Sequence, residues 1–146
     1  MSVHTRTLLA VLAALAAPSC SGLVANIAGD ALSGDGTTFS SDDDPELVRE
    51  AIPFGLKTME SLLASSPEHV GLLTSTASGF TQYAYAFVQQ DANEAEATDP
   101  ARARLLRARA KRLFHRAVGY GFRGLTASWG DDFPAAFEKD RKAAVA

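Results

Sequence analysis

The sequence has one cysteine, Cys20, and no apolar run long enough to cross a bilayer. A lone cysteine excludes a disulfide within the chain, so the fold has to be held together by packing. The longest apolar run, Leu8–Ala17, has ten residues, whereas a spanning helix needs roughly 20. The net charge of −3 argues against a nucleic-acid partner.

Catalytic and metal-binding motifs are also missing. The sequence contains no G-x-S-x-G, no H-E-x-x-H and no phosphate loop, and its three histidines match no zinc spacing. Residues 119–124 fit G-x-G-x-x-G but follow a predicted helix, so these glycines are expected to end a helix or to allow close helix contact. Asp42-Asp43-Asp44 lacks the alternation of a calcium loop. We therefore expect neither an enzyme nor a bound cofactor or metal ion.

The N-terminal residues predict a secretory signal. A head with Arg6 precedes the run Leu8–Ala17, and Pro18-Ser19-Cys20 follows it. A cysteine at this junction is typical of bacterial lipoproteins, in which the thiol is acylated and becomes the first mature residue. The alternative is an ordinary signal peptide in which Cys20 has no role. The expected organisation is a signal peptide over 1–19, an anchor segment with a short helix and a loop over 20–44, and a partial helical-repeat domain over 45–146.

Helix signals dominate the remaining sequence. Prolines that directly follow an Asp or Ser predict helix starts, because the capping side chain accepts a hydrogen bond from an early backbone N–H and proline has none to lose. The expected starts are Pro45, Pro67 and Pro100. Pro53 is expected to kink or split the first helix near Ile52. Short helices are expected over Leu23–Leu32 and Phe133–Val145.

Each long helix carries one apolar stripe at spacings of three and four residues. The stripes are Val48, Ile52, Leu56, Met59 and Leu63; Val70, Leu73, Ala77, Phe80, Ala84 and Phe87; and Ala103, Leu106, Ala110, Leu113, Ala117 and Tyr120. No alternating pattern predicts a strand. Because the connection at 65–67 is short, its two helices are expected to pack antiparallel. The predicted fold is all-α, with antiparallel helix pairs of the helical-repeat kind.

Charge divides the chain into two blocks. Residues 42–99 contain eleven acidic and two basic residues, whereas residues 100–123 contain eight basic residues and no acidic one. Either the blocks face each other across a helix pair, or the basic helix lines a surface for anions. Arg102, Arg109 and Arg116 recur every seven residues and share one helix face. Guanidinium groups hold carboxylates through two parallel hydrogen bonds.

Aromatic residues gather in the second helix. Phe80 and Phe87 lie on its apolar stripe and are expected in the core. Tyr83 and Tyr85 are expected to point elsewhere and to line a groove or an interface. Packing in the core or at an interface is the default interpretation for all four residues.

Three segments, in order, resemble signatures of the TatT family, the T components of tripartite ATP-independent periplasmic (TRAP) transporters. They are Asp42–Leu63, Gly79–Val88 and Arg107–Leu125. The resemblance implies tetratricopeptide-like helix pairs, a periplasmic lipoprotein that associates with the substrate-binding subunit, and trimers with a channel for a small hydrophobic or anionic ligand. It implies no catalysis. Family members are about twice as long, so the resemblance is to their N-terminal half, and a helix stack cut short is expected.

The expected function is that of a TRAP accessory protein, anchored through Cys20 on the periplasmic face of the inner or outer membrane. A groove is expected to bind the substrate-binding subunit and to conduct the ligand. Its expected residues are Tyr83, Tyr85, Arg102, Arg109 and Arg116. The alternative is a general helical-repeat envelope adaptor without a role in transport.

Overall fold

The computed structural model describes residues 41–140, and every element in this range is helical. The elements are α4 (Pro45–Ser65), α5 (Val70–Tyr83), the π-helix η1 (Ala84–Gln89), α6 (Gln90–Ala95), α7 (Pro100–Trp129) and α8 (Phe133–Lys139). The prediction of an all-α fold is confirmed. Cys20 and the expected helix over Leu23–Leu32 lie outside the described residues.

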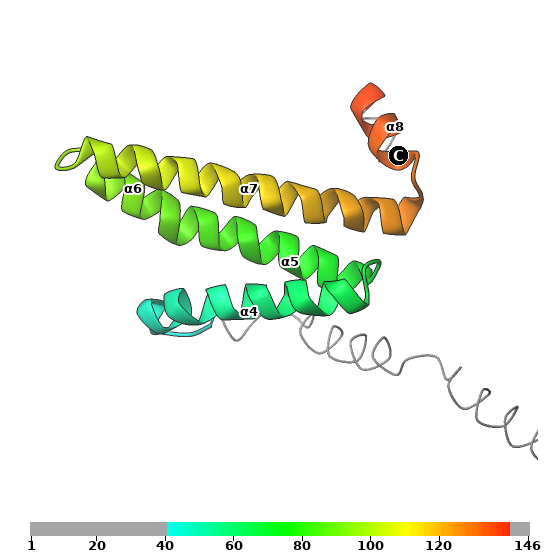
Figure 1. Cartoon of the computed structure of the whole chain (residues 1–146), viewed down its shortest axis with the longest axis horizontal. Coiled ribbons are helices and arrows are strands. Elements are labelled where there is room, and N and C mark those ends of the chain that lie inside the picture. The colour runs from blue at the N-terminus through cyan, green and yellow to red at the C-terminus, as the bar shows by residue number, and fades with distance from the viewer. Residues whose placement is uncertain (1–40, 141–146) are drawn as a thin grey trace, which may run out of the picture.

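Three helical rods lie side by side in one layer (Figure 1). α5, η1 and α6 follow one another as a single rod, which packs between α4 and α7. The rods alternate in direction, as the short connection after α4 predicts. α8 follows a turn at the end of α7 and packs against that end.

Side-chain caps fix two of the three predicted helix starts. Asp44 accepts hydrogen bonds from the backbone N–H groups of Glu46 and Leu47, at 3.1 and 3.0 Å. Asp99 accepts one from the backbone N–H of Arg102 at 2.9 Å. Each side chain satisfies N–H groups that have no partner inside the helix. The predicted starts at Pro45 and Pro100 are therefore confirmed.

The predicted start at Pro67 is wrong, because the cap is a different residue. The backbone N–H of Ser66 donates to the carbonyl of Leu62 and closes α4, which leaves Pro67 in the turn. Nδ1 of His69 then accepts from the backbone N–H of Leu72 at 3.1 Å, and α5 begins at Val70. Of the kink or split predicted at Pro53, the split is wrong, since α4 is one continuous element through that proline.

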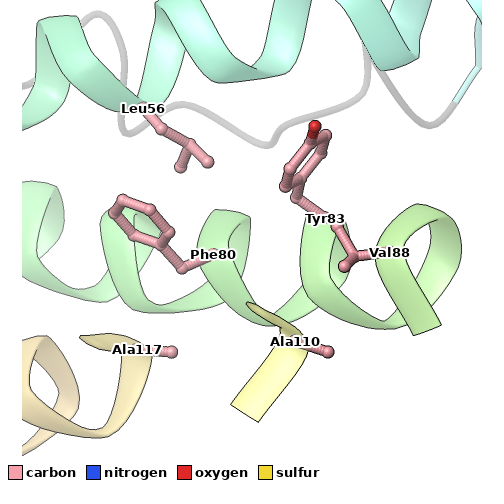
Figure 2. Close-up of a cluster of buried hydrophobic side chains, with 6 residues drawn as sticks. All are labelled: Leu56, Phe80, Tyr83, Val88, Ala110 and Ala117. Carbon is pink, nitrogen blue, oxygen red and sulfur yellow. The ribbon is translucent and has the colours of Figure 1, made fainter. Parts of the chain in front are cut away.

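The main core lies where the three rods meet (Figure 2). Leu56 of α4 faces Phe80 and Tyr83 of α5, while Ala110 and Ala117 of α7 lie on the other side of α5. A second cluster near the α4–α5 turn consists of Leu63, Leu72 and Leu73. Burying one such leucine contributes roughly 1.5–3 kcal/mol relative to leaving it exposed.

The apolar stripes of α4 and α7 are confirmed, and that of the second helix is confirmed except at Val70. The buried positions along the middle rod are Leu72, Leu73, Thr76, Phe80, Tyr83, Ala84, Val88 and Ala92, and six of them recur at steps of four residues from Leu72 to Ala92. Steps of four residues exceed a 3.6-residue turn, and the wider i→i+5 turns of η1 keep these positions facing the same neighbours. Val70 is 40% exposed because it lies about 200° around α5 from Leu72. Tyr83 is 9% exposed and belongs to the core cluster.

α7 approaches α5 closely because small residues line its inner face. Ala103, Ala110, Ala117 and Gly124 recur every seven residues and are all buried. A Cβ atom at Gly124 would lie 3.5 Å from the Cβ of Leu73. Close helix contact is thus correct for Gly124, but the expectation that residues 119–124 end the helix is wrong, since α7 continues to Trp129.

Candidate functional site

Four arginine side chains each lie over an aromatic ring. Their guanidinium carbons are 4.8 to 5.7 Å from the ring centroids. The pairs are Arg49 over Phe87, Arg109 over Tyr83, Arg116 over Phe80 and Arg123 over Tyr120. We call these eight residues the arginine–aromatic row. Each such contact contributes about 0.5–1 kcal/mol where it is solvent-exposed and holds the guanidinium in a defined orientation.

A seven-residue repeat in α7 places three of these arginines. Arg109, Arg116 and Arg123 directly precede the buried small residues Ala110, Ala117 and Gly124. Successive residues differ by about 100° around a helix. When the small residue faces α5, the preceding arginine therefore lies at the margin of the interface and reaches over a neighbouring ring. The aromatic partners on the middle rod, Phe80, Tyr83 and Phe87, follow one another at spacings of three and four residues.

Glu60 links α4 to α7. Its Oε1 accepts from the hydroxyl of Tyr120 at 2.7 Å and lies 2.5 Å from Nε of Arg116. Its Oε2 accepts from Nζ of Lys57 at 2.7 Å. Burial alone would raise the pKa of Glu60, but the hydrogen bonds from Lys57 and Tyr120 and the charge of Arg116 lower it below its usual value. Burial, together with the bond to Glu60, raises the pKa of Tyr120.

Arg49 links α4 to α6 in a similar way. Its Nη1 donates to both carboxylate oxygens of Asp91 at 2.9 Å. This hydrogen bond is the main reason that the pKa of Arg49 is raised. Arg49 also covers the ring of Phe87. It therefore holds the N-terminal end of α4 against the π-helical part of the middle rod.

The row keeps uncompensated positive charge. Arg49 and Arg116 each contact a carboxylate. Arg109 and Arg123 contact none among residues 41–140: Nη2 of Arg109 donates to the hydroxyl of Tyr83 at 3.3 Å, and Nη2 of Arg123 donates to the carbonyl of Pro67 at 2.9 Å. Their remaining N–H groups are suited to carboxylate or phosphate oxygens.

Three of the five residues predicted to form the binding groove belong to the row. They are Tyr83, Arg109 and Arg116, although the ring of Tyr83 is buried and does not line an open surface. Tyr85 is 62% exposed and makes no ring or hydrogen-bond contact with the described residues. The side chain of Arg102 is exposed and contacts no carboxylate within the same range.

Sequence reasoning missed Arg49, Glu60 and Arg123. The signal for Arg123 was present, because it continues the series of arginines that precede small residues every seven positions. Glu60 carries no comparable signal, since its partner Tyr120 is 60 positions away. The first interpretation of the charge blocks is confirmed in part, because Arg107 pairs with Glu96 and Arg116 with Glu60. A surface for anions stays a prediction.

Across residues 41–140, no cluster of His, Cys, Asp and Glu side chains is suited to hold a metal ion. Among the helices of the same range, none combines the length and the apolar character that crossing a membrane requires.

The fold and the row define an all-helical module in which arginine side chains cover aromatic rings. Comparison with known proteins assigns it more narrowly: residues 41–146 match the family model TAtT, TRAP transporter T-component, and the chain belongs to this family. The resemblance seen in the sequence is thereby confirmed. The family is a transporter accessory family and not an enzyme family.

One relative has been matched at moderate identity. An uncharacterized protein of Treponema pallidum (strain Nichols) is 32% identical over 96 residues, which cover 62% of this chain and 28% of that protein. The chain therefore spans less than a third of the length of the curated relative that it matches. No solved structure matches the chain.

Proposed function

We propose that this protein is a lipid-anchored periplasmic accessory component of a TRAP transporter and that it binds the substrate-binding subunit. The observation that carries the proposal is the family match over residues 41–146. Cys20 would carry the lipid, because it directly follows the apolar run of a signal peptide. The antiparallel packing of α4, the middle rod and α7 would be tetratricopeptide-like.

The arginine–aromatic row is the proposed ligand site. Arg109 and Arg123 offer N–H donors that no carboxylate among the described residues occupies. Stacking on Tyr83 and Tyr120 holds these guanidinium groups in place before a ligand arrives, which reduces the entropy lost on binding. Such a row suits a small ligand that has an anionic group and an apolar part.

The partner is tested by affinity purification from native membranes. The tagged, lipidated full chain is extracted in mild detergent, and the bound proteins are identified by mass spectrometry. Recovery of a TRAP substrate-binding protein supports the proposal. Recovery of other envelope proteins in its place overturns it and supports the general adaptor.

Cys20→Ser is the matched control for anchoring, since it should release the protein from the membrane fraction. Light scattering on the purified chain tests the trimer that the family resemblance implies.

A further inference from the structure

One flank of α4 is apolar and carries no charged side chain. Because successive residues lie about 100° apart around a helix, five residues of α4 fall within one sector of about 100°. These residues, which we call the apolar flank of α4, are Leu47, Ala51, Phe54, Gly55 and Thr58. All charged residues of α4 fall within a second such sector, and its buried residues fall within a third, between the other two.

The apolar flank is largely exposed. Phe54 is 79% exposed and Leu47 is 56% exposed. A Cβ atom at Gly55 would meet no other side chain of the described residues within 4 Å, so another helix can approach the backbone closely there. The hydroxyl of Thr58 donates to the carbonyl of Phe54 at 3.0 Å, so its hydrogen is already bonded within α4. Covering such an uncharged surface is favourable, because it removes apolar area from water.

The chain itself contains a segment whose chemistry matches this flank. The sequence predicts a short helix over residues 23–32, and Asn26 and Asp30 share one side of it. The other side is apolar and consists of Leu23, Val24, Ile27, Ala28 and Ala31. An isolated helix of this length is marginal in water, so it needs a surface against which it can bury its apolar side.

The lengths of the two elements and of the chain between them allow this contact. A helix over residues 23–32 is about 15 Å long, and Leu47 and Thr58 are about 16 Å apart along α4, at 1.5 Å per residue. Residues 33–44 connect the segment to the start of α4, and an extended chain of that length reaches roughly 40 Å. Since α4 is itself only about 32 Å long, the segment can lie along the whole flank.

Two observations favour this segment over other occupants. A short covalent connection gives an effective concentration of the order of millimolar, which exceeds that of a second copy of the chain in dilute solution. Amphipathic helices that lie on membranes are rich in Lys and Arg on the polar side, whereas no Lys or Arg occurs between Cys20 and Arg49. The composition of the segment therefore suits an uncharged protein surface better than an anionic membrane.

We infer that residues 23–32 form a helix that docks on the apolar flank of α4. Docking leaves only Ser21 and Gly22 between this helix and the proposed lipid on Cys20, so the domain is held close to the membrane. Without docking, residues 21–44 would be a tether that reaches up to about 80 Å. The effect on the tether rests on the proposed lipid anchor, whereas the docking itself does not.

Hydrogen–deuterium exchange of the full chain in mild detergent, read by mass spectrometry, measures the protection of the backbone amides of residues 23–32. Phe54→Asp places a charge in the apolar flank. Tyr85→Asp is the matched control, because Tyr85 is also an exposed aromatic residue but lies on the middle rod. We expect Phe54→Asp to lower the protection on the order of tenfold and Tyr85→Asp to leave it unchanged. Circular dichroism verifies that each variant is helical.

A thiol on the flank tests the contact from the other side. Thr58→Cys is alkylated with iodoacetamide, and the modified peptide is identified by mass spectrometry, so that Cys20 does not contribute to the rate. Ile27→Asp should accelerate this alkylation on the order of tenfold, because the docked segment covers the thiol. Glu50→Cys is the control, since Glu50 lies exposed in the charged sector of α4 and its alkylation should not respond to Ile27→Asp.

Equal protection of residues 23–32 in the wild type and in Phe54→Asp would overturn the inference, as would an unchanged alkylation rate at Thr58→Cys. Protection that survives Phe54→Asp and increases with added lipid vesicles would overturn it by assigning the segment to the membrane. Protection that is lost on dilution of the protein would overturn it by assigning the flank to a second copy. None of these results bears on the proposed TRAP role, which the affinity purification tests separately.

Discussion

Arg116 on α7 and Glu60 on α4 are in contact, with 2.5 Å between Nε and Oε1, although α5 lies between their helices in the layer. Tyr120 reaches the same carboxylate oxygen from the next turn of α7. These contacts pass over one side of α5 and join the two outer rods. The ring of Phe80, on that side of α5, is thereby covered by Arg116 and stacked on Tyr120 at 5.9 Å. One carboxylate thus orders half of the arginine–aromatic row.

Glu60→Gln is expected to lower the free energy of unfolding by about 1–3 kcal/mol. The side chain is 8% exposed and accepts hydrogen bonds from Lys57 and Tyr120, and hydrogen bonds to charged groups contribute roughly 1.5–3 kcal/mol each before solvent exposure of the partners is considered. Urea denaturation followed by circular dichroism measures the loss. Glu50→Gln is the matched control, because Glu50 lies exposed on the same helix. Equal stability of the two variants would contradict the role of Glu60.

The same carboxylate predicts how stability depends on pH. Because the folded pKa of Glu60 is lowered, the unfolded chain binds more protons in acid, and the stabilisation by Glu60 is present above the unfolded value of about 4.3 and is lost as pH falls through the folded pKa. The raised pKa of Tyr120 acts in the opposite sense: its contribution is present below the unfolded value of about 10 and is lost as pH rises through the folded pKa.

Denaturation curves over a pH series test both signs. Glu60→Gln should flatten the acid limb of the stability curve, and Tyr120→Phe should flatten the alkaline limb. A variant that lowers stability by the same amount at every pH would show that the residue acts through packing and not through its ionisation.

Two substitutions on α7 should change stability in opposite directions. Ala110 is 1% exposed against the middle rod, so Ala110→Leu should overpack the interface and cost about 1–3 kcal/mol. Gly119 lies inside the helix with open space where a Cβ would be, so Gly119→Ala should stabilise the protein by about 0.5–1 kcal/mol through helix propensity. Thermal melts monitored at the helical circular dichroism band measure both, and an increase in Tm for Ala110→Leu would contradict the close approach of α7 to α5.

Local signals predicted most of the fold. Asp44 and Asp99 predict the starts of their helices, because capping depends only on adjacent residues. The apolar stripes of α4 and α7 follow from helical periodicity. The errors arose where a choice depended on the neighbours. The proline after Ser66 has the same local pattern, yet the Ser66 N–H closes α4 and His69 provides the cap. No local pattern in the sequence predicted the π-helix η1, whose wider turns determine which residues of the middle rod face α7.

The site was predicted only in part, because its contacts also depend on residues from other helices. The repeat of arginines was visible in the sequence, but the ring under each arginine belongs in most cases to a different element. Tyr83 and Tyr85 are two positions apart and both aromatic, and only packing decides that the first is buried and the second exposed. Glu60 acquires its role from residues on another helix, which no spacing rule connects to it.

Arg109→Gln should weaken binding of an anionic amphiphile at the arginine–aromatic row. Decanoate is a suitable probe, because it combines a carboxylate with an apolar chain. Among the described residues Arg109 contacts the ring and hydroxyl of Tyr83 but no carboxylate, so its other N–H groups are available to an anion. Losing a hydrogen bond to a charged group, about 1.5–3 kcal/mol, predicts a roughly ten- to hundredfold increase in Kd.

Isothermal titration calorimetry of the full chain in detergent measures this change, with detergent alone as the blank. Arg104→Gln removes the same charge from a different face of α7 and should leave the Kd for decanoate unchanged. Equal weakening by Arg104→Gln would mean that decanoate responds to the overall charge of α7, since the two residues share that helix but not the same face. Unchanged binding by Arg109→Gln would remove the arginine–aromatic row as the ligand site.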